Sequence, residues 1–224
     1  VEGTYNVLEA SKNLKLKEVI ITSTSETYGT AKYIPIDEKH RLIGQSPYSA
    51  SKISADQLAI SYHRSFDLPV KIVKPFNTFG PRQSQRAIIP SIILQMIHEK
   101  KLSLGNLWPT RDFLYVTDTC NAFLEIMKCK KLIGDVVNIG NGKEISVKKL
   151  VEKVSKILEK KYIIKKDSRR IRPSRSEVDR LCCDNKKLKK LTKWKPQYSL
   201  DEGLRETVDW YLEFQNKKTK IYHI

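Results

Sequence analysis

The chain has 224 residues, of which 40% are hydrophobic and 30% charged, so it has ample length and apolar content for a globular core. No apolar run approaches the roughly 20 residues that span a bilayer, and the first residues do not resemble a signal peptide. We therefore expect a cytoplasmic protein with no membrane partner.

The net charge of +17 comes from lysines and arginines that crowd into the C-terminal third. A nucleic-acid surface would interleave them with aromatic side chains or carry a zinc-finger or RNA-recognition motif. The sequence shows neither, so we expect no nucleic-acid partner, and we interpret the charges as solvated helix faces with a few arginines reserved for a smaller anion. The cysteines match no zinc-ligand spacing, which predicts reduced thiols and no metal site. They are Cys120, Cys129, Cys182 and Cys183.

Residues 1–16 are predicted to form an amphipathic helix, and residues 19–21 a strand buried on both faces, as in a parallel sheet. Polar side chains follow this strand, namely Ser23, Thr24 and Glu26. Ligands of open α/β sheets lie beyond the carboxyl ends of the strands, which predicts a site here. The alternative is that the hydroxyls only satisfy loop backbone groups. The expected apolar side of the first helix is Val7, Leu8, Leu14 and Leu16.

Residues 46–66 are predicted to form a helix with Ser46 as its N-cap and Pro47 at its first position. Tyr48 and Lys52 then lie one turn apart, with Cβ atoms roughly 5–6 Å from each other. Half-ionising a tyrosine at pH 7 costs roughly 4 kcal/mol, and a cation about 4 Å away supplies about that much in a partly buried site. The pair is therefore a candidate proton acceptor, although such pairs also occur by chance on helix surfaces.

Further along, we expect strands at 70–73, 102–104, 136–139 and 162–164, and helices at 87–100, 117–128, 146–160, 184–191 and 200–214. Thr117 is the expected cap of its helix. The alternation predicts an α/β fold: an incomplete Rossmann-type parallel sheet flanked by helices, with a smaller mixed α/β domain. We expect residues 1–80 to belong to the first domain and 81–224 mainly to the second, with segments near 116–141 packing back on the first.

Six motifs, in order along the chain, resemble extended short-chain dehydrogenase/reductases of the NAD-dependent epimerase/dehydratase family. The similarity is strongest to nucleotide-sugar 4,6-dehydratases of the GDP-mannose type and of the legionaminic-pathway N-acetylglucosamine type. Glu26 favours these over 4-epimerases, which usually have a small residue there. The motifs are residues 3–10, Ser23–Gly29, Tyr48 with Lys52, Pro75–Arg82, residues 111–118 and Asn138–Gly140.

The resemblance implies NAD as cofactor and a nucleotide-sugar as substrate. Hydride leaves C4 while Tyr48 takes the C4 hydroxyl proton and Thr24 orients that oxygen; Glu26 removes the C5 proton, water leaves from C6, and hydride returns to C6. The implied catalytic residues are Thr24, Glu26, Tyr48 and Lys52. Those implied for the cofactor are Ser23, Tyr48, Lys52 and Pro75, and those for the substrate are Ser25, Asn77, Arg82, Arg111 and Arg172.

The sequence departs from the family in two places. Ser25 stands where glucose-type dehydratases have Asp, so the acid for the departing C6 oxygen must be Glu26 itself or water. A glycine-rich dinucleotide turn is absent. We therefore expect a truncated or split protein that exposes one side of its sheet and binds NAD poorly alone.

Three interpretations stay open at this point. The first is a 4,6-dehydratase or a fragment of one. The second is a nucleotide-sugar 4-epimerase or decarboxylase, and the third is a non-catalytic nucleotide-binding or split-subunit remnant. Family members are commonly homodimers, and we expect the Tyr48 helix to pack in a bundle between subunits.

Overall fold

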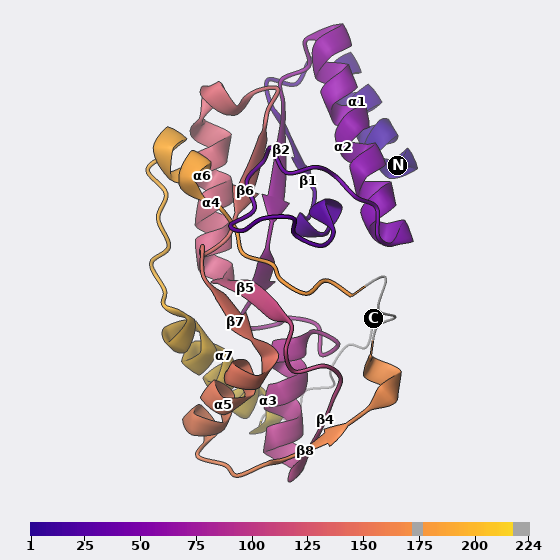
Figure 1. Cartoon of the computed structure of the whole chain (residues 1–224). Coiled ribbons are helices and arrows are strands. Elements are labelled where there is room, and N and C mark those ends of the chain that lie inside the picture. Colours follow the sequence, from indigo (N-terminus) through magenta and orange to yellow (C-terminus); the bar gives the residue numbers. More distant parts are fainter. Residues whose placement is uncertain (172–176, 217–224) are drawn as a thin grey trace.

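The computed structural model describes residues 1–171 and 177–216, and its two ends hold different sets of elements (Figure 1). One end is built on a parallel sheet in the order β1-β2-β6. Its strands are β1 (Val19–Thr22), β2 (Val70–Pro75) and β6 (Val136–Ile139). The helices around it are α1 (Glu2–Asn13), α2 (Pro47–Phe66), α4 (Val116–Lys128) and α6 (Lys186–Leu191), with 3-10 turns at Ser25–Tyr28 (η1) and Lys130–Leu132 (η2).

Both faces of this sheet are covered, because the side chains of β2 alternate between two cores. Val70 and Ile72 pack in the cluster that includes Leu8 of α1 and Ala59 of α2. Val73 packs on the opposite side, in the cluster formed with α4 and α6. The arrangement has three layers, helix on sheet on helix, and it directs the carboxyl ends of β1 and β2 to the same edge.

The other end has its own core, formed by α3, α5 and α7 against short strands. In a mixed sheet, β5 pairs parallel with β3 and antiparallel with β7, while β4 pairs parallel with β8. The strands are β3 (Asn77–Phe79), β4 (Lys101–Leu104), β5 (Thr110–Tyr115), β7 (Glu144–Ser146) and β8 (Ile163–Lys166). The helices are α3 (Ile88–His98), α5 (Val147–Leu158) and α7 (Leu200–Asn216), with a 3-10 turn at Ser168–Arg170 (η3).

The predicted fold class is confirmed, since the chain is an α/β protein with a parallel sheet flanked by helices. The division into residues 1–80 and 81–224 stays a prediction. In the structure β6 pairs with β2, so a strand from residues 136–139 completes the sheet that β1 begins.

Two local predictions are wrong. Of the four residues expected on the apolar side of the first helix, only Leu8 is buried, whereas Val7, Leu14 and Leu16 are exposed. Thr117 does not cap its helix: α4 begins one residue earlier, at Val116, and no side chain caps its first turn.

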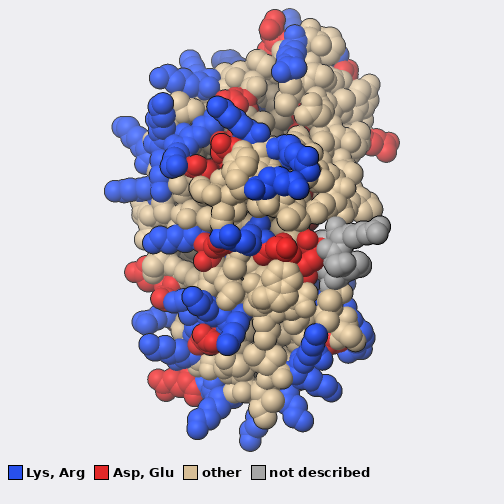
Figure 2. All heavy atoms as spheres, viewed as in Figure 1, with Lys and Arg blue, Asp and Glu red and all other residues tan. Residues whose placement is uncertain are grey.

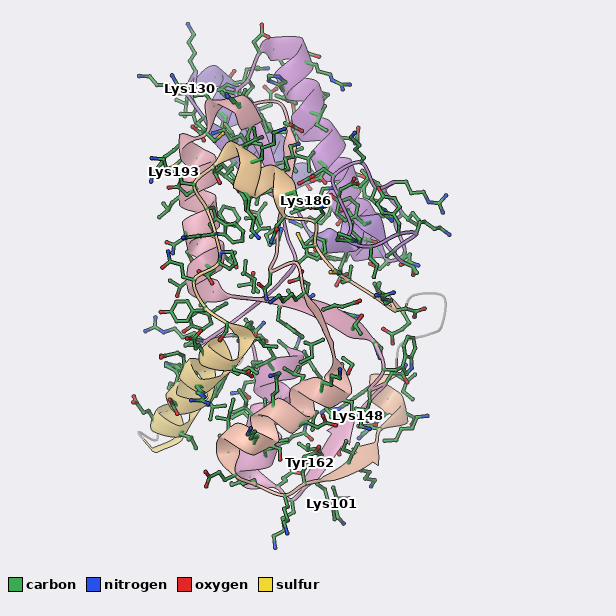
Figure 3. The ribbon with its side chains drawn as sticks, turned by 60° about the vertical axis from the view of Figure 1, so that its left-hand side comes forward. Lys101, Lys130, Lys148, Tyr162, Lys186 and Lys193 are labelled. Atoms are coloured by element: carbon green, nitrogen blue, oxygen red, sulfur yellow. The ribbon has the colours of Figure 1, made fainter. Side chains whose placement is uncertain are left out.

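Lysine and arginine side chains are spread along the whole length of the visible face (Figure 2). The labelled lysines of Figure 3 show the same distribution, with Lys130 at one end of the molecule and Lys101 at the other. Within the described residues, no helix is long and apolar enough to cross a membrane. The same residues contain no group of three His, Cys, Asp or Glu side chains able to hold a metal ion.

Candidate active site

The helix that carries Tyr48 and Lys52 begins as the sequence predicts. Ser46 has an extended backbone (φ −143°), its Oγ accepts a hydrogen bond from the N–H of Ser49 at 3.1 Å, and the Ser49 hydroxyl accepts in turn from the N–H of Ser46. Pro47 occupies the first turn, where a missing N–H costs nothing. These local features fix the start of α2 and thus the direction in which Tyr48 leaves it.

Lys52 ties this helix to the end of β1. Its Nζ donates to the backbone carbonyl of Thr22 at 3.0 Å, across 30 residues of sequence. Tyr48, one turn earlier on α2, keeps 51% of its side chain exposed. The pair therefore stands at the carboxyl edge of the sheet with the phenol open to a ligand.

The residues that follow β1 are held by their own hydroxyls. Ser23 is buried, and its Oγ donates to Oδ2 of Asp56 at 2.8 Å. Thr24 Oγ1 accepts the N–H of Glu26 at 3.2 Å and so caps the turn η1. Ser25 is buried within this turn. Glu26, in contrast, reaches the wall of a cavity.

This cavity has a volume of about 430 Å³ and lies between the two ends of the molecule. Glu26, Asn77 and Arg111, three of the predicted site residues, all line it. The Asn77 side-chain amide donates to the carbonyl of Asp112 at 3.4 Å, which connects the end of β3 with β5. Residues from several separate stretches of sequence thus meet at one opening.

Arg111 is anchored on both sides of its guanidinium group. One terminal nitrogen donates to the carbonyl of Thr110 at 2.9 Å, and the other lies 3.5 Å from a carboxylate oxygen of Glu177. Its side chain is mostly buried in the cavity wall. These contacts fix the orientation of the guanidinium plane.

Two further arginines line the same cavity, and sequence reasoning missed both as site residues. They are Arg86, just before α3, and Arg170, whose guanidinium donates to the Ser91 hydroxyl at 3.3 Å. The sequence offered a weak signal for each: Arg86 lies four residues after the candidate Arg82, and Arg170 belongs to the basic run that was interpreted as solvated.

The remaining predicted residues lie elsewhere. Arg82 is exposed, has a left-handed backbone (φ 64°) and does not line the cavity. Pro75 is the last residue of β2, opposite Ile139 of β6, at the same edge as Ser23. Arg172 falls outside the described residues.

A buried carboxylate lies next to Arg111 in the sequence. Asp112, beside Arg111 in β5, accepts three backbone hydrogen bonds, from the N–H groups of Asn141 (2.8 Å), Gly142 (2.8 Å) and Cys183 (3.0 Å). Burial raises the pKa of Asp112 from 3.8 to about 6, and the three N–H groups act in the opposite direction. This side chain therefore joins β5 to the loop after β6 and to the segment before α6.

Comparison with known proteins defines the class of the protein. It resembles the crystal structure of dTDP-glucose 4,6-dehydratase from Bacillus anthracis in complex with NAD, with a TM-score of 0.89 and 32% identity over 96% of this chain and 68% of that one. The fold and the Tyr48/Lys52 helix are those of an extended short-chain dehydrogenase/reductase.

The family follows from the sequence match. The family model described as GDP-mannose 4,6 dehydratase matches residues 1–207, and the chain belongs to this family. It is 34% identical over 213 residues to the low-salt glycan biosynthesis protein Agl12 of Haloferax volcanii, covering 95% of this chain and 67% of that protein. It is 31% identical over 215 residues to a putative UDP-glucose 4-epimerase of Methanocaldococcus jannaschii, and this match covers 94% of this chain and 68% of that protein. The chain spans about two thirds of the length of these relatives.

Proposed function

We propose that this chain carries the catalytic part of a nucleotide-sugar 4,6-dehydratase, which converts its substrate to the 4-keto-6-deoxy form. The observation that carries the proposal is the position of Glu26 in the wall of the arginine-lined cavity, two residues after Thr24. Elimination of water across C5 and C6 needs a base at C5, and a carboxylate at this point supplies one.

The other residues of the edge suit the steps around that elimination. Lys52 stabilises Tyr48 as the phenolate, and this phenolate accepts the C4 hydroxyl proton. Because Thr24 Oγ1 accepts the Glu26 N–H, its own proton is left to bind the C4 oxygen. The C4 ketone makes the C5 proton acidic; Glu26 takes it and delivers it to the departing C6 hydroxyl, which leaves as water. When hydride returns to C6, C5 takes up a proton from solvent, which balances the C4 hydroxyl proton that Tyr48 releases.

NAD is the cofactor that this reaction requires, and the residues proposed for it are Ser23, Tyr48, Lys52 and Pro75. Ser23 follows β1 and Pro75 ends β2, while Lys52, one turn after Tyr48 on α2, donates to the Thr22 carbonyl at the end of β1; open α/β sheets bind ligands at this edge. The Tyr48 hydroxyl and the Lys52 ammonium are donors that match ribose hydroxyls. When bound, NAD supplies the hydride acceptor for C4 and the hydride donor for C6.

The cavity supports a sugar nucleotide as substrate. Its volume of about 430 Å³ lies within the roughly 300–1,000 Å³ usual for small-molecule sites. Guanidinium groups pair bidentately with phosphate oxygens, which suits Arg86, Arg111 and Arg170 to the pyrophosphate. Asn77 and Ser25 are proposed to contact the sugar. Arg82 and Arg172 remain candidates for the phosphates.

The test is Glu26→Gln, assayed with NAD at saturating concentration, because we expect the chain to bind NAD weakly, and with GDP-, UDP- and dTDP-sugars. We expect the wild type to form a product that has lost one water by mass spectrometry, and the variant to lose at least a hundredfold in rate. Glu152→Gln, an exposed site on α5, is the matched control. Dehydration that survives Glu26→Gln would refute the assignment.

The same assay separates the other candidates. The epimerase relative favours a 4-epimerase as second candidate, and its product would be an isomer with unchanged mass. If the chain binds nucleoside diphosphates but forms no product, a nucleotide-binding role without catalysis gains support.

We also propose a cytoplasmic homodimer that buries α1 and α2 between its subunits. The support is a group of apolar side chains left exposed on these helices, among them Tyr5, Val7 and Phe66.

A further inference from the structure

A buried ion pair joins α2 to β2 beside the site. Lys74 Nζ lies 3.2 Å from Oδ2 of Asp56, and each side chain is only 2% exposed. Loss of water raises the pKa of Asp56 and lowers that of Lys74. Since a buried pair of this kind commonly stabilises a fold no more than apolar residues of similar volume would, its retention calls for a second role.

The hydrogen bonds of the pair indicate that role. The Lys74 ammonium donates to the hydroxyl of Thr27 at 2.9 Å, and that hydroxyl donates to the carbonyl of Thr24 at 2.8 Å. On the other side, Asp56 accepts the hydroxyl of Ser23 at 2.8 Å. Both members of the pair therefore hold the segment in which Thr24 and Glu26 lie.

The same pair reaches the other half of the site. Asp56 follows Lys52 by one helical turn and Tyr48 by two, so all three lie along one stripe of α2. The short backbone hydrogen bonds of residues 23–29 run to β2 and to the loop after these residues: the Ser23 N–H donates to the Val73 carbonyl at 2.7 Å, and the Thr27 carbonyl accepts the Ile43 N–H at 2.8 Å. The connection of the segment to Asp56 of α2 is made by side chains, through the Ser23 hydroxyl and through Thr27 and Lys74.

We propose that Thr27, Lys74 and Asp56 are positioning residues that set the place of Thr24 and Glu26 relative to Tyr48 and Lys52. The proposal deepens the proposed dehydratase function and rests on it. Thr27 is the critical link, because its hydroxyl accepts from Lys74 and donates to Thr24 at the same time.

The first test needs no activity. Thr27→Val removes the hydroxyl but keeps the shape and the ion pair, and Thr207→Val is the matched control, since Thr207 is also fully buried and donates to a backbone carbonyl, that of Gly203. Hydrogen–deuterium exchange by mass spectrometry should show amides of residues 23–29 exchanging at least tenfold faster in Thr27→Val, with residues 88–98 unchanged.

The controls concern the same amides. Thr207→Val should leave the exchange rates of residues 23–29 as in the wild type, and Thr27→Ser should return these rates to the wild-type values. Unchanged exchange in Thr27→Val, or faster exchange that serine does not reverse, would overturn the proposal.

The second test is kinetic. In Thr27→Val, kcat for dehydration should fall at least tenfold while KM changes less than twofold, because the arginines of the cavity are untouched. Thr27→Ser should recover most of kcat. An active Thr27→Val enzyme with wild-type kcat would contradict the proposal. If the wild type dehydrates no nucleotide sugar, the proposed function fails, and the exchange experiment still decides whether these residues position the turn.

Discussion

The arginines of the cavity differ in how firmly the fold holds them. Arg111 bonds to a backbone carbonyl and lies beside Glu177, whereas Arg86 is exposed at its mouth. A restrained guanidinium loses less conformational freedom on binding an anion. We therefore propose that Arg111 orients a phosphate and that Arg86 mainly adds charge.

For Arg86 we predict a loss of affinity without loss of fold. Removing one charged hydrogen-bond donor costs about 1.5–3 kcal/mol, roughly tenfold to a hundredfold in Kd. Arg86→Gln should weaken binding of GDP, UDP and dTDP by that factor in calorimetric titrations. Arg64→Gln, an exposed site on α2, is the control and should bind as the wild type does. Equal affinities for the wild type, Arg86→Gln and Arg64→Gln would show that Arg86 does not bind the nucleotide.

Asp112 predicts a pH dependence of stability. Its pKa is higher in the folded chain, about 6, than its ordinary 3.8, so folding takes up a proton between these values. Its contribution to the free energy of unfolding is therefore largest below pH 3.8 and is lost as the pH rises to about 6. Relative to Asp112→Asn, the wild type should lose roughly 2–3 kcal/mol between pH 4 and pH 6. Urea unfolding at several pH values measures this, and parallel pH profiles would contradict the raised pKa.

At the scale of elements, the end of α4 depends on a lysine from the sheet. Lys71 of β2 is fully buried, and its Nζ donates to the carbonyls of Ile126 and Met127 at 2.8 Å each and to Glu18 at 2.6 Å. These carbonyls belong to the last turn of α4, where a helix leaves acceptors unpaired and where its dipole favours a cation. One side chain thus joins the sheet to its covering helix.

Lys71→Met should accordingly lower the free energy of unfolding by about 2–4 kcal/mol, because two carbonyls and Glu18 lose a buried partner. Lys128→Met provides the comparison: that lysine is 67% exposed in its pair with Glu125, and its loss should cost less than about 1 kcal/mol. Urea denaturation at neutral pH measures both. A similarly small loss of unfolding free energy in the two variants would show that the hydrogen bonds of Lys71 to the end of α4 contribute little to stability.

At the scale of the whole molecule, the exposed apolar side chains of α1 and α2 predict an assembly. Tyr62 of α2 packs edge-on against Phe66, with ring centroids 5.2 Å apart, while Phe66 itself stays 52% exposed. The wild type should sediment as a dimer at micromolar concentration, and Phe66→Glu should shift it to a monomer. Ile163→Glu is the control, since this residue is equally open but lies on β8 at the other end. A monomeric wild type would end the proposal.

Local sequence determined much of this protein. Ser46 and Pro47 specify the start of α2, and the four-residue spacing of Tyr48 and Lys52 puts them on one face, because capping and helical periodicity act between neighbours. The apolar run at residues 19–21 likewise predicted β1 as a strand covered on both faces, and strands were predicted at 70–73 and 136–139, where the structure has β2 and β6.

The tertiary structure alone decided which distant residues meet. Phe79 is part of a strand only because it pairs with Tyr115 of β5, and such three-residue strands carry no periodicity of their own. Arg86, Arg111 and Arg170 line one cavity although Arg170 lies 84 residues after Arg86 and 59 residues after Arg111 in the sequence.

 Arg170 is the last of these three along the chain, and only the packing of η3 against α3 brings it to the other two. Lys71 lies in the predicted strand 70–73 and Lys74 follows it directly, and both are buried because α4 and α2 supply their partners from other parts of the chain. Such burial depends on long-range partners, and no local pattern in a single sequence encodes them.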